Sequence, residues 1–266
     1  MIEIKTYVAN KKEELKNKIK NLNKIPKIVI VQVNDDPASN SYIKGKIKDL
    51  TEVGFLYEHI KLDLKTTEED LLKLVEKLNN DSDVDGFIVQ LPLPKQINEE
   101  KIKLAISPKK DVDGFNPLSK TIPATPFGIY NYLKDNDFAF KGKNAIVIGR
   151  SNIVGKPMAK LLLDNDMNVT VVHSKTSLED MKFYIKHADL IVVAVGKEGF
   201  LSNKFEFNKN CVIIDVGINR GVDGKLHGDA TPNLDVKFQS PVPGGVGLLT
   251  RLALLLNLLE VTYNEF

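Results

Sequence analysis

The chain has 266 residues, of which 42% are hydrophobic and 27% are charged, and its formal net charge is +2. This length predicts a globular protein with one large or two small domains, and the small net charge gives no reason to expect a nucleic-acid partner. The single cysteine, Cys211, excludes an internal disulfide, and residues 1–5 lack the layout of a signal peptide. Residues 248–259, which contain Arg251 and Asn257, fall short of the ~18 residues of a membrane span. We therefore expect a cytoplasmic protein with no membrane partner.

The first 115 residues alternate between strands and helices. Apolar patterning predicts strands at 27–33, 56–62 and 87–91, and helices at 39–53 and from Thr66 onward. Gly54 ends the first of these helices, and the sequence Thr66-Thr67-Glu68-Glu69 begins the second with a capping-box pattern. This alternation predicts an α/β domain with a parallel sheet.

A second alternating series begins after residue 126. Strands are predicted at 144–148, 168–172, 190–195 and 212–216, with helices near 154–165 and 177–187. The last helix, from Gly247 to about residue 261, is apolar on most faces and must be buried. We therefore predict two α/β domains, one at 1–119 plus 244–266 and a Rossmann-type nucleotide-binding domain at 120–243. The last helix is expected to return to the first domain.

The turn at Gly149 is the most informative segment. An apolar strand stops at Gly149, and an apolar stripe at helical spacing resumes at Val154. Such a strand–turn–helix brings a dinucleotide phosphate to the N–H groups at a helix N-terminus. The spacing departs from G-x-G-x-x-G, because Ser151 stands at the second glycine and the third glycine is Gly155. Arg150 and Ser151 add a cation and a hydroxyl where the phosphate would lie.

The end of the second strand of this domain indicates which dinucleotide binds. An NAD site places an acidic residue there to hold the ribose 2′-hydroxyl, and residues 169–177 contain none. Arg150, Ser174 and Lys175 instead suit a 2′-phosphate, which favours NADP. The alternative for His173 and Lys175 is an ordinary loop at a strand exit.

Three side chains of the first domain could carry chemistry. Tyr42 and Lys46 are four residues apart on one helix face, where a ring could stack and an amine could transfer protons. Gln90 stands at the C-terminal end of a strand, where open α/β sheets bind ligands. The alternatives are a surface tyrosine beside one of many solvated lysines, and an amide that satisfies loop backbone.

Asp111 and Asp113 lie two residues apart in a predicted loop. No further ligands stand at suitable spacing, so we expect no metal site. One carboxylate could pair with the N–H groups of a heterocyclic substrate, and the other could stabilise the loop as an Asx turn.

These segments, in this order, resemble the bifunctional methylenetetrahydrofolate dehydrogenase/methenyltetrahydrofolate cyclohydrolase family over nearly the whole chain. The motifs that carry the resemblance are Pro37-Ala-Ser with Tyr42 and Lys46, 86–94, 110–114, 149–157, 173–176, 215–219 and 241–247. Several widely spaced motifs agree, which makes the match far more specific than the glycine turn alone.

The resemblance implies two reactions on tetrahydrofolate derivatives. NADP⁺ accepts a hydride from 5,10-methylenetetrahydrofolate, and water then opens the 5,10-methenyl product to 10-formyltetrahydrofolate. By resemblance, Lys46 is the catalytic group of hydrolysis, Gln90 orients it, Tyr42 stacks on the folate and Asp113 holds the pterin. A lowered pKa would keep the lysine neutral beside a cationic intermediate.

The resemblance also implies the remaining contacts and the assembly. The cofactor-contacting positions are Gly149, Arg150, Ser151, Ser174 and Ile218. The loop that closes over the folate contains Pro243, Gly244 and Gly245, and the family suggests a homodimer.

Two positions depart from the family pattern. Ala124 replaces a frequent cysteine, and Leu248 replaces a frequent proline at the start of the last helix. Two alternatives stay open: a dehydrogenase with weak or no cyclohydrolase activity, and a non-catalytic folate- or NADP-binding protein. A protein that only binds has no need of a tuned lysine.

Overall fold

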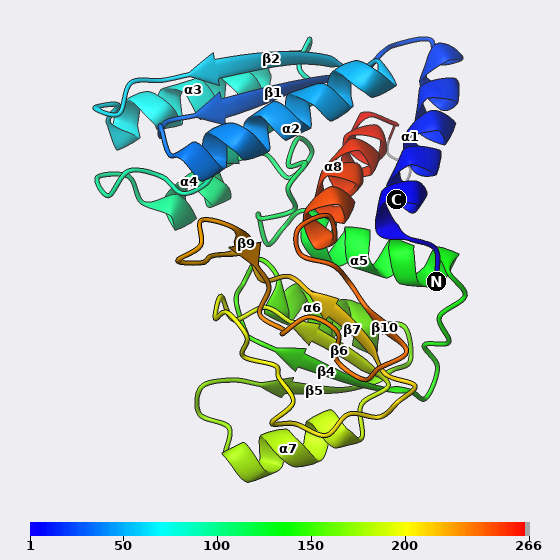
Figure 1. Cartoon of the computed structure of the whole chain (residues 1–266). Coiled ribbons are helices and arrows are strands. Elements are labelled where there is room, and N and C mark those ends of the chain that lie inside the picture. Colours follow the sequence, from blue (N-terminus) through cyan, green and yellow to red (C-terminus); the bar gives the residue numbers. More distant parts are fainter. Residues whose placement is uncertain (264–266) are drawn as a thin grey trace. The chain divides into compact units, whose positions relative to one another are not determined.

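The computed structural model describes residues 1–263 (Figure 1). Its internal contacts divide the chain into two units. The N-terminal unit consists of Ala9–Ala124 and Arg251–Phe266, and the C-terminal unit consists of Met1–Val8 and Thr125–Thr250. The units are defined by contacts within the chain, whereas the predicted domains were defined by the ligand that each binds. The division into domains at 1–119 plus 244–266 and 120–243 therefore stays a prediction.

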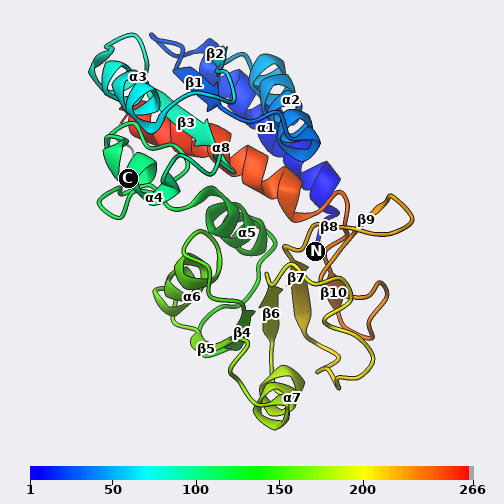
Figure 2. The same ribbon diagram turned by 90° about the vertical axis from the view of Figure 1, so that its left-hand side faces the viewer.

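The N-terminal unit contains a three-stranded parallel sheet in the order β2–β1–β3. Its strands are β1 (Lys27–Gln32), β2 (Leu56–Lys61) and β3 (Gly86–Gln90), connected by α2 (Pro37–Val53) and α3 (Glu68–Asn80). Helix α4 (Glu99–Ala105) follows β3. Helix α1 (Ile4–Lys20) precedes β1, and most of its residues belong to this unit. Figure 2 shows α2 and α3 on opposite sides of this sheet.

Local sequence explains these elements. Val29 and Val31 of β1 are fully buried in one cluster with Leu71 and Val75 of α3, so alternate strand residues face one helix stripe. The α3 helix begins where the Thr67 side chain accepts a hydrogen bond from Asp70 N at 3.1 Å. The predicted strands and helices of this unit therefore form with shifts of one or two residues at their ends.

The C-terminal unit contains a five-stranded parallel sheet in the order β10–β7–β6–β4–β5. Its strands are β4 (Asn144–Ile148), β5 (Asn168–Val172), β6 (Leu190–Val193), β7 (Val212–Asp215) and β10 (Phe238–Gln239), and β8 (Asn219–Arg220) and β9 (Leu226–His227) form a separate hairpin. Its helices are α5 (Ala124–Asp135), α6 (Gly155–Leu163) and α7 (Leu178–Lys186). In Figure 1, α7 lies on one side of the sheet and α6 on the other.

The strand order creates a place for a ligand. From β4 the chain moves to β5 on one side and then to β6 on the other, so the order reverses between β4 and β6. Ligands bind at the carboxyl ends of strands at such a point. The predicted fold class, two α/β domains with a Rossmann-type C-terminal domain, is confirmed.

The structure adds elements and shortens one strand. Helices α1, α4 and α5 and strands β8, β9 and β10 were not predicted. Strand β6 ends at Val193 and not at Val195, because the N–H of Val195 donates to the Asp229 carboxylate at 2.7 Å and not to a neighbouring strand.

The last helix, α8 (Val246–Tyr263), returns to the N-terminal unit, as predicted. The fully buried Asn257 donates through Nδ2 to Val112 O at 2.8 Å and to Ile122 O at 3.0 Å. The expectation that no apolar stretch reaches the length of a membrane span is wrong, because α8 extends beyond the predicted stretch to 18 residues with a mean hydropathy of 1.4. Length and composition alone are weak evidence for a span, and 56% of this helix is buried inside the protein, as in the core helix of a soluble protein.

Candidate functional site

Lys46 is the central residue of the site in the N-terminal unit. It lies in the middle of α2, and its side chain is buried, with 5% exposed. Its Nζ donates to Gln90 Oε1 at 3.1 Å and lies 5.1 Å from the centre of the Tyr42 ring, one turn earlier. The alternative in which Lys46 is one of many solvated lysines is therefore wrong.

Gln90 reaches Lys46 because it is the last residue of β3. Its Nε2 donates to Leu91 O at 2.8 Å, and this bond to the backbone directs Oε1 toward Lys46. The Gln90 amide therefore satisfies loop backbone and also contacts Lys46, and its role toward a ligand stays a prediction.

A backbone bridge brings the two aspartates beside β3. Phe87 N donates to Lys110 O at 3.0 Å, and Phe87 pairs with Asp111 in a parallel bridge. The buried Asp111 carboxylate accepts from Gly114 N at 3.0 Å and from Asn116 N at 2.8 Å, so Asp111 stabilises the loop.

Asp113 and Lys46 form the charged part of the site. Burial lowers the pKa of the Lys46 amine and raises the pKa of the Asp113 carboxyl. The attraction between the two charges opposes both effects. Loss of solvation therefore favours a neutral amine and a neutral acid at this site, and the pair interaction moderates that preference.

Asp111 provides a stability test of this loop. We expect Asp111→Ala to lower the free energy of unfolding by about 1–3 kcal/mol for each backbone N–H that loses its acceptor. Burial raises the pKa of Asp111 to about 6 from its ordinary 3.8. The folded protein therefore holds this proton more tightly, and its stability relative to the alanine variant should fall as pH rises from about 4 to about 6.

Urea unfolding of both proteins at several pH values measures this difference. Asp83→Ala, which removes an exposed carboxyl of the same unit, is the control. A difference between wild type and Asp111→Ala that grows over this pH range would contradict the prediction.

The turn between β4 and α6 is packed against the next strand. Gly149 has a φ of +121°, and a Cβ there would lie 2.3 Å from Ala194 O. A Cβ on Gly155 would lie 2.3 Å from Gly149 O. Only glycine fits at these positions, so the backbone can approach a phosphate closely.

Ser151 has a second role besides the predicted one. Its Oγ accepts from Val154 N at 3.2 Å and from Gly155 N at 3.3 Å, which satisfies two of the free N–H groups where α6 begins. The hydroxyl proton remains to donate to a phosphate oxygen.

A cavity of about 510 Å³ lies at the reversal point of this sheet. It is lined by Ile148, Gly149, Arg150, His173, Ser174, Thr176, Leu178, Met181, Ala194, Val195, Lys197, Phe200 and Phe205. Two cations and no carboxylate are among these residues, which suits a 2′-phosphate. The predicted contacts Gly149, Arg150 and Ser174 are brought together here, whereas Ser151 and Ile218 are not among the lining residues.

The loop 241–245 precedes α8. A Cβ on Gly245 would lie 2.2 Å from Pro241 O, Gly244 has a φ of +95°, and Pro243 is exposed. Leu248 N donates to Gly245 O at 2.9 Å. Leucine thus supplies a hydrogen bond that proline could not make at this position, which holds the beginning of the helix.

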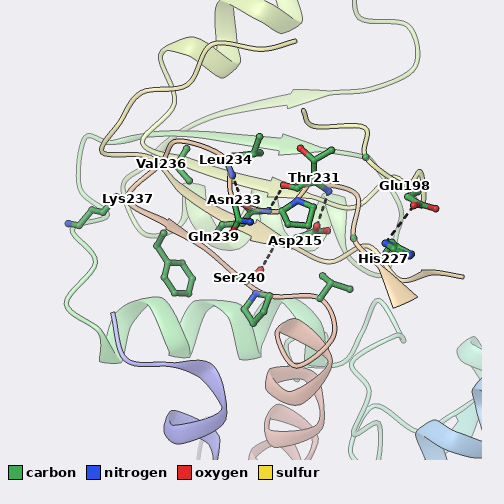
Figure 3. A pocket seen from close by; sticks show the side chains of 17 residues that line it. Glu198, Asp215, His227, Thr231, Asn233, Leu234, Val236, Lys237, Gln239 and Ser240 are labelled. Carbon is green, nitrogen blue, oxygen red and sulfur yellow. Dashed lines mark hydrogen bonds and ion pairs between the residues drawn. The ribbon is translucent and has the colours of Figure 1, made fainter. Parts of the chain in front are cut away.

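A second cavity, of about 490 Å³, lies in the same unit and was not predicted. Figure 3 shows Asp215 joined to Ser240 within it and His227 joined to Glu198 at its edge. Asp215 N donates to Ser240 Oγ at 2.8 Å, and the Asp215 carboxylate accepts from backbone N–H groups. These buried polar groups therefore serve the fold.

The arrangement of histidine, cysteine and carboxylate side chains bears on metal binding. Within residues 1–263, no group of three or more of them is placed to hold a metal ion.

Comparison with known proteins identifies the family. Residues 2–113 match the family model "Tetrahydrofolate dehydrogenase/cyclohydrolase, catalytic domain", and residues 123–266 match its "NAD(P)-binding domain". The chain belongs to this family.

Relatives of the family resemble the chain over nearly its whole length. The protein named "Bifunctional protein FolD" of Lactococcus lactis is 42% identical, and the match covers 94% of this chain and 92% of the relative. The protein of the same name in Staphylococcus epidermidis is 44% identical, with 93% and 91% covered.

Solved structures of the family agree with the fold. The methylenetetrahydrofolate dehydrogenase/cyclohydrolase of Campylobacter jejuni has a TM-score of 0.93 at 37% identity, with 99% of this chain and 98% of that chain covered. The Trypanosoma brucei enzyme, solved with NADP cofactor and inhibitor, has a TM-score of 0.91 at 28% identity, with 99% and 97% covered.

Proposed function

We propose that the protein is a bifunctional folate enzyme. It oxidises 5,10-methylenetetrahydrofolate with NADP⁺ and hydrolyses the 5,10-methenyl product to 10-formyltetrahydrofolate. The observation that carries this proposal is the buried amine of Lys46, bonded to Gln90 and close enough to Asp113 for their charges to interact. The names of the family and of its relatives support the same two activities.

The C-terminal unit serves the oxidation by binding the dinucleotide. The close backbone approach that Gly149 and Gly155 allow, together with the Ser151 hydroxyl, fits a diphosphate, and Arg150 and Ser174 fit a 2′-phosphate. When bound, NADP⁺ supplies the acceptor for the hydride. The task of these residues is to hold and orient it, because hydride transfer requires close approach to the folate carbon.

The N-terminal unit serves the hydrolysis. Water adds to the amidinium carbon and gives one proton to the neutral Lys46 amine. The bond from that carbon to one folate nitrogen then breaks as the proton of the new hydroxyl moves to the nitrogen and the oxygen becomes the formyl carbonyl. Gln90 orients the amine, Tyr42 stacks on the folate and Asp113 binds the pterin N–H groups. The loop containing Pro243, Gly244 and Gly245 contacts the folate, and Ile218 and Ser151 complete the cofactor contacts.

The alternatives are less well supported. Burying the Lys46 amine without a full counter-charge lowers the stability of the fold. A protein that only binds folate or NADP has no function for such an amine, so the burial would bring it no benefit. A dehydrogenase without cyclohydrolase activity would have no use for the Lys46–Gln90 contact.

The test is spectroscopic turnover of 5,10-methylenetetrahydrofolate with NADP⁺, followed to the formyl product. Separate hydrolysis of the methenyl compound distinguishes the two activities. Oxidation without hydrolysis would favour a dehydrogenase that lacks cyclohydrolase activity. If neither reaction is observed, the non-catalytic binding protein is favoured.

The pH dependence of hydrolysis tests the role of the amine. Burial lowers the pKa of Lys46 below its ordinary 10.5, so the rate should rise with pH and level off below that value. In Gln90→Glu a carboxylate faces Nζ, and the rising limb should move up by about 1–3 pH units. Gln96→Glu, at an exposed glutamine of the same unit, should leave the profile unchanged. An unmoved limb in Gln90→Glu would remove Lys46 from the proton transfer.

We further propose that the enzyme is a cytoplasmic homodimer, as the resemblance suggests. Light scattering after size exclusion should give twice the mass of the chain, and cell fractionation should place it with soluble proteins. A monomer that retains both activities would contradict the assembly without affecting the chemistry.

A further inference from the structure

The Asp229 carboxylate is fully buried and accepts four hydrogen bonds. Its Oδ2 accepts from Val195 N at 2.7 Å and from Gly196 N at 3.0 Å. Its Oδ1 accepts from Lys197 N at 2.8 Å and from Asn219 Nδ2 at 2.9 Å. One carboxylate therefore holds three consecutive N–H groups of a loop more than thirty residues earlier in the chain.

The segments that Asp229 holds lie at the cofactor site. Val195 and Lys197 line the cavity at the sheet reversal. Asn219 directly follows Ile218, a proposed cofactor contact. A Cβ on Gly217 would lie 2.3 Å from Asp229 Oδ1, so this segment packs directly on the carboxylate.

A second buried carboxylate fixes the position of Asp229 itself. Asp215, at the end of β7, accepts from Asp229 N at 3.0 Å, Ala230 N at 2.8 Å and Gly217 N at 2.9 Å. Asp229 is thus anchored to the sheet through its backbone and reaches the β6 loop through its side chain. The geometry of residues 195–197 depends on this connection, because their N–H groups leave the strand ladder there.

We infer that Asp229 is a positioning residue for the oxidation. Its carboxylate holds the loop at 195–197 and the segment at 217–219 in the arrangement that binds the dinucleotide, and it acts through those segments without contacting the reacting atoms. This inference rests on the proposed placement of the cofactor.

The test compares Asp229→Asn with wild type. Asparagine has the same shape but one acceptor oxygen, so one pair of N–H donors loses its partner. We expect the KM for NADP⁺ to rise by about tenfold or more, as for loss of hydrogen bonds to a charged group. The rate of methenyl hydrolysis, which uses Lys46 in the other unit, should stay unchanged, and so should the KM for the folate.

Asp223→Asn is the matched control. This exposed carboxylate of the β8–β9 hairpin contacts Lys225 N and His227, and its loss should leave the KM for NADP⁺ unchanged. An unchanged KM for NADP⁺ in folded Asp229→Asn would overturn the inference. A parallel fall of both activities would also overturn it, because a general structural role affects both.

Gly217→Ala decides the matter if Asp229→Asn does not fold. The added methyl would lie 2.3 Å from Asp229 Oδ1 and 2.4 Å from Asp229 N, so it displaces residue 229 without removing its carboxylate, and the KM for NADP⁺ should again rise while hydrolysis persists. An unchanged KM there would overturn the inference. Arg150→Ala separates this result from a wrong cofactor placement: if it raises the KM for NADP⁺ and Asp229→Asn does not, the positioning role alone is wrong.

Discussion

Lys46→Ala is expected to lower the rate of methenyl hydrolysis by about 10²- to 10⁴-fold, the usual contribution of a general acid–base group. The variant loses the amine of α2 that donates to Gln90 Oε1 at 3.1 Å. Tetrahydrofolate should still bind, because the proposed contacts from Tyr42 and Asp113 remain. The measurement is the absorbance change of the methenyl compound, with folate binding followed separately by titration.

Lys48→Ala provides the control for this experiment. Lys48 lies two residues further along the same helix and is exposed, so its removal changes the helix charge equally without reaching the site. Hydrolysis at the wild-type rate in Lys46→Ala would exclude the lysine from the mechanism and withdraw the main support for the proposed function.

Arg150→Ala and Ser174→Ala are each expected to lower kcat/KM for NADP⁺ by about 10- to 100-fold. A charge-assisted contact to phosphate contributes about 1.5–3 kcal/mol to binding. NAD⁺ lacks the 2′-phosphate, so it makes no such contact and the substitution removes nothing from its binding. The value of kcat/KM for NAD⁺ should therefore stay unchanged, which reduces the preference between the cofactors. Steady-state kinetics with both cofactors measure this ratio.

The matched control for the cofactor variants is Lys160→Ala. Lys160 is an exposed cation near the end of α6 that is paired with Asp164, so its loss removes a charge away from the cavity. Equal losses with NADP⁺ and NAD⁺ in Arg150→Ala would indicate a contact to the diphosphate and contradict the proposed 2′-phosphate pocket.

Much of the site could be predicted because its parts have local signals. The helical spacing of Tyr42 and Lys46 placed both on one face, and Gln90 was recognisable at a strand end because the apolar run stops there. The glycine turn at 149 required only a strand, a break and a helix. Periodicity and turn chemistry act over a few residues, so the sequence can be used to predict them.

Some roles could not be assigned without the structure. The residue pattern alone leaves Asp111 and Asp113 equivalent, and only the family resemblance points to Asp113; the structure shows that Asp111 is the loop-stabilising one, because it accepts from Gly114 N and Asn116 N. Asp229 had no signal of its own, because its partners at 195–197 are more than thirty residues away. The end of β6 at Val193 could not be predicted for the same reason, because it depends on the hydrogen bond from Val195 N to the distant Asp229.

The two α/β series, the dinucleotide-binding turn, the family resemblance and the candidate residues could all be found from the amino-acid sequence, because they depend on local patterns and residue types. Which carboxylates accept from backbone groups, and how deeply Lys46 is buried, became known from the three-dimensional structure. The pair of Gly45 and Arg251 illustrates the reason: a Cβ on Gly45 would lie 1.9 Å from Arg251 Nη1, and Arg251 forms an ion pair with the buried Asp49 at 2.8 Å. Burial and the sharing of hydrogen-bond donors depend on contacts between residues far apart in the chain, and no local pattern encodes them.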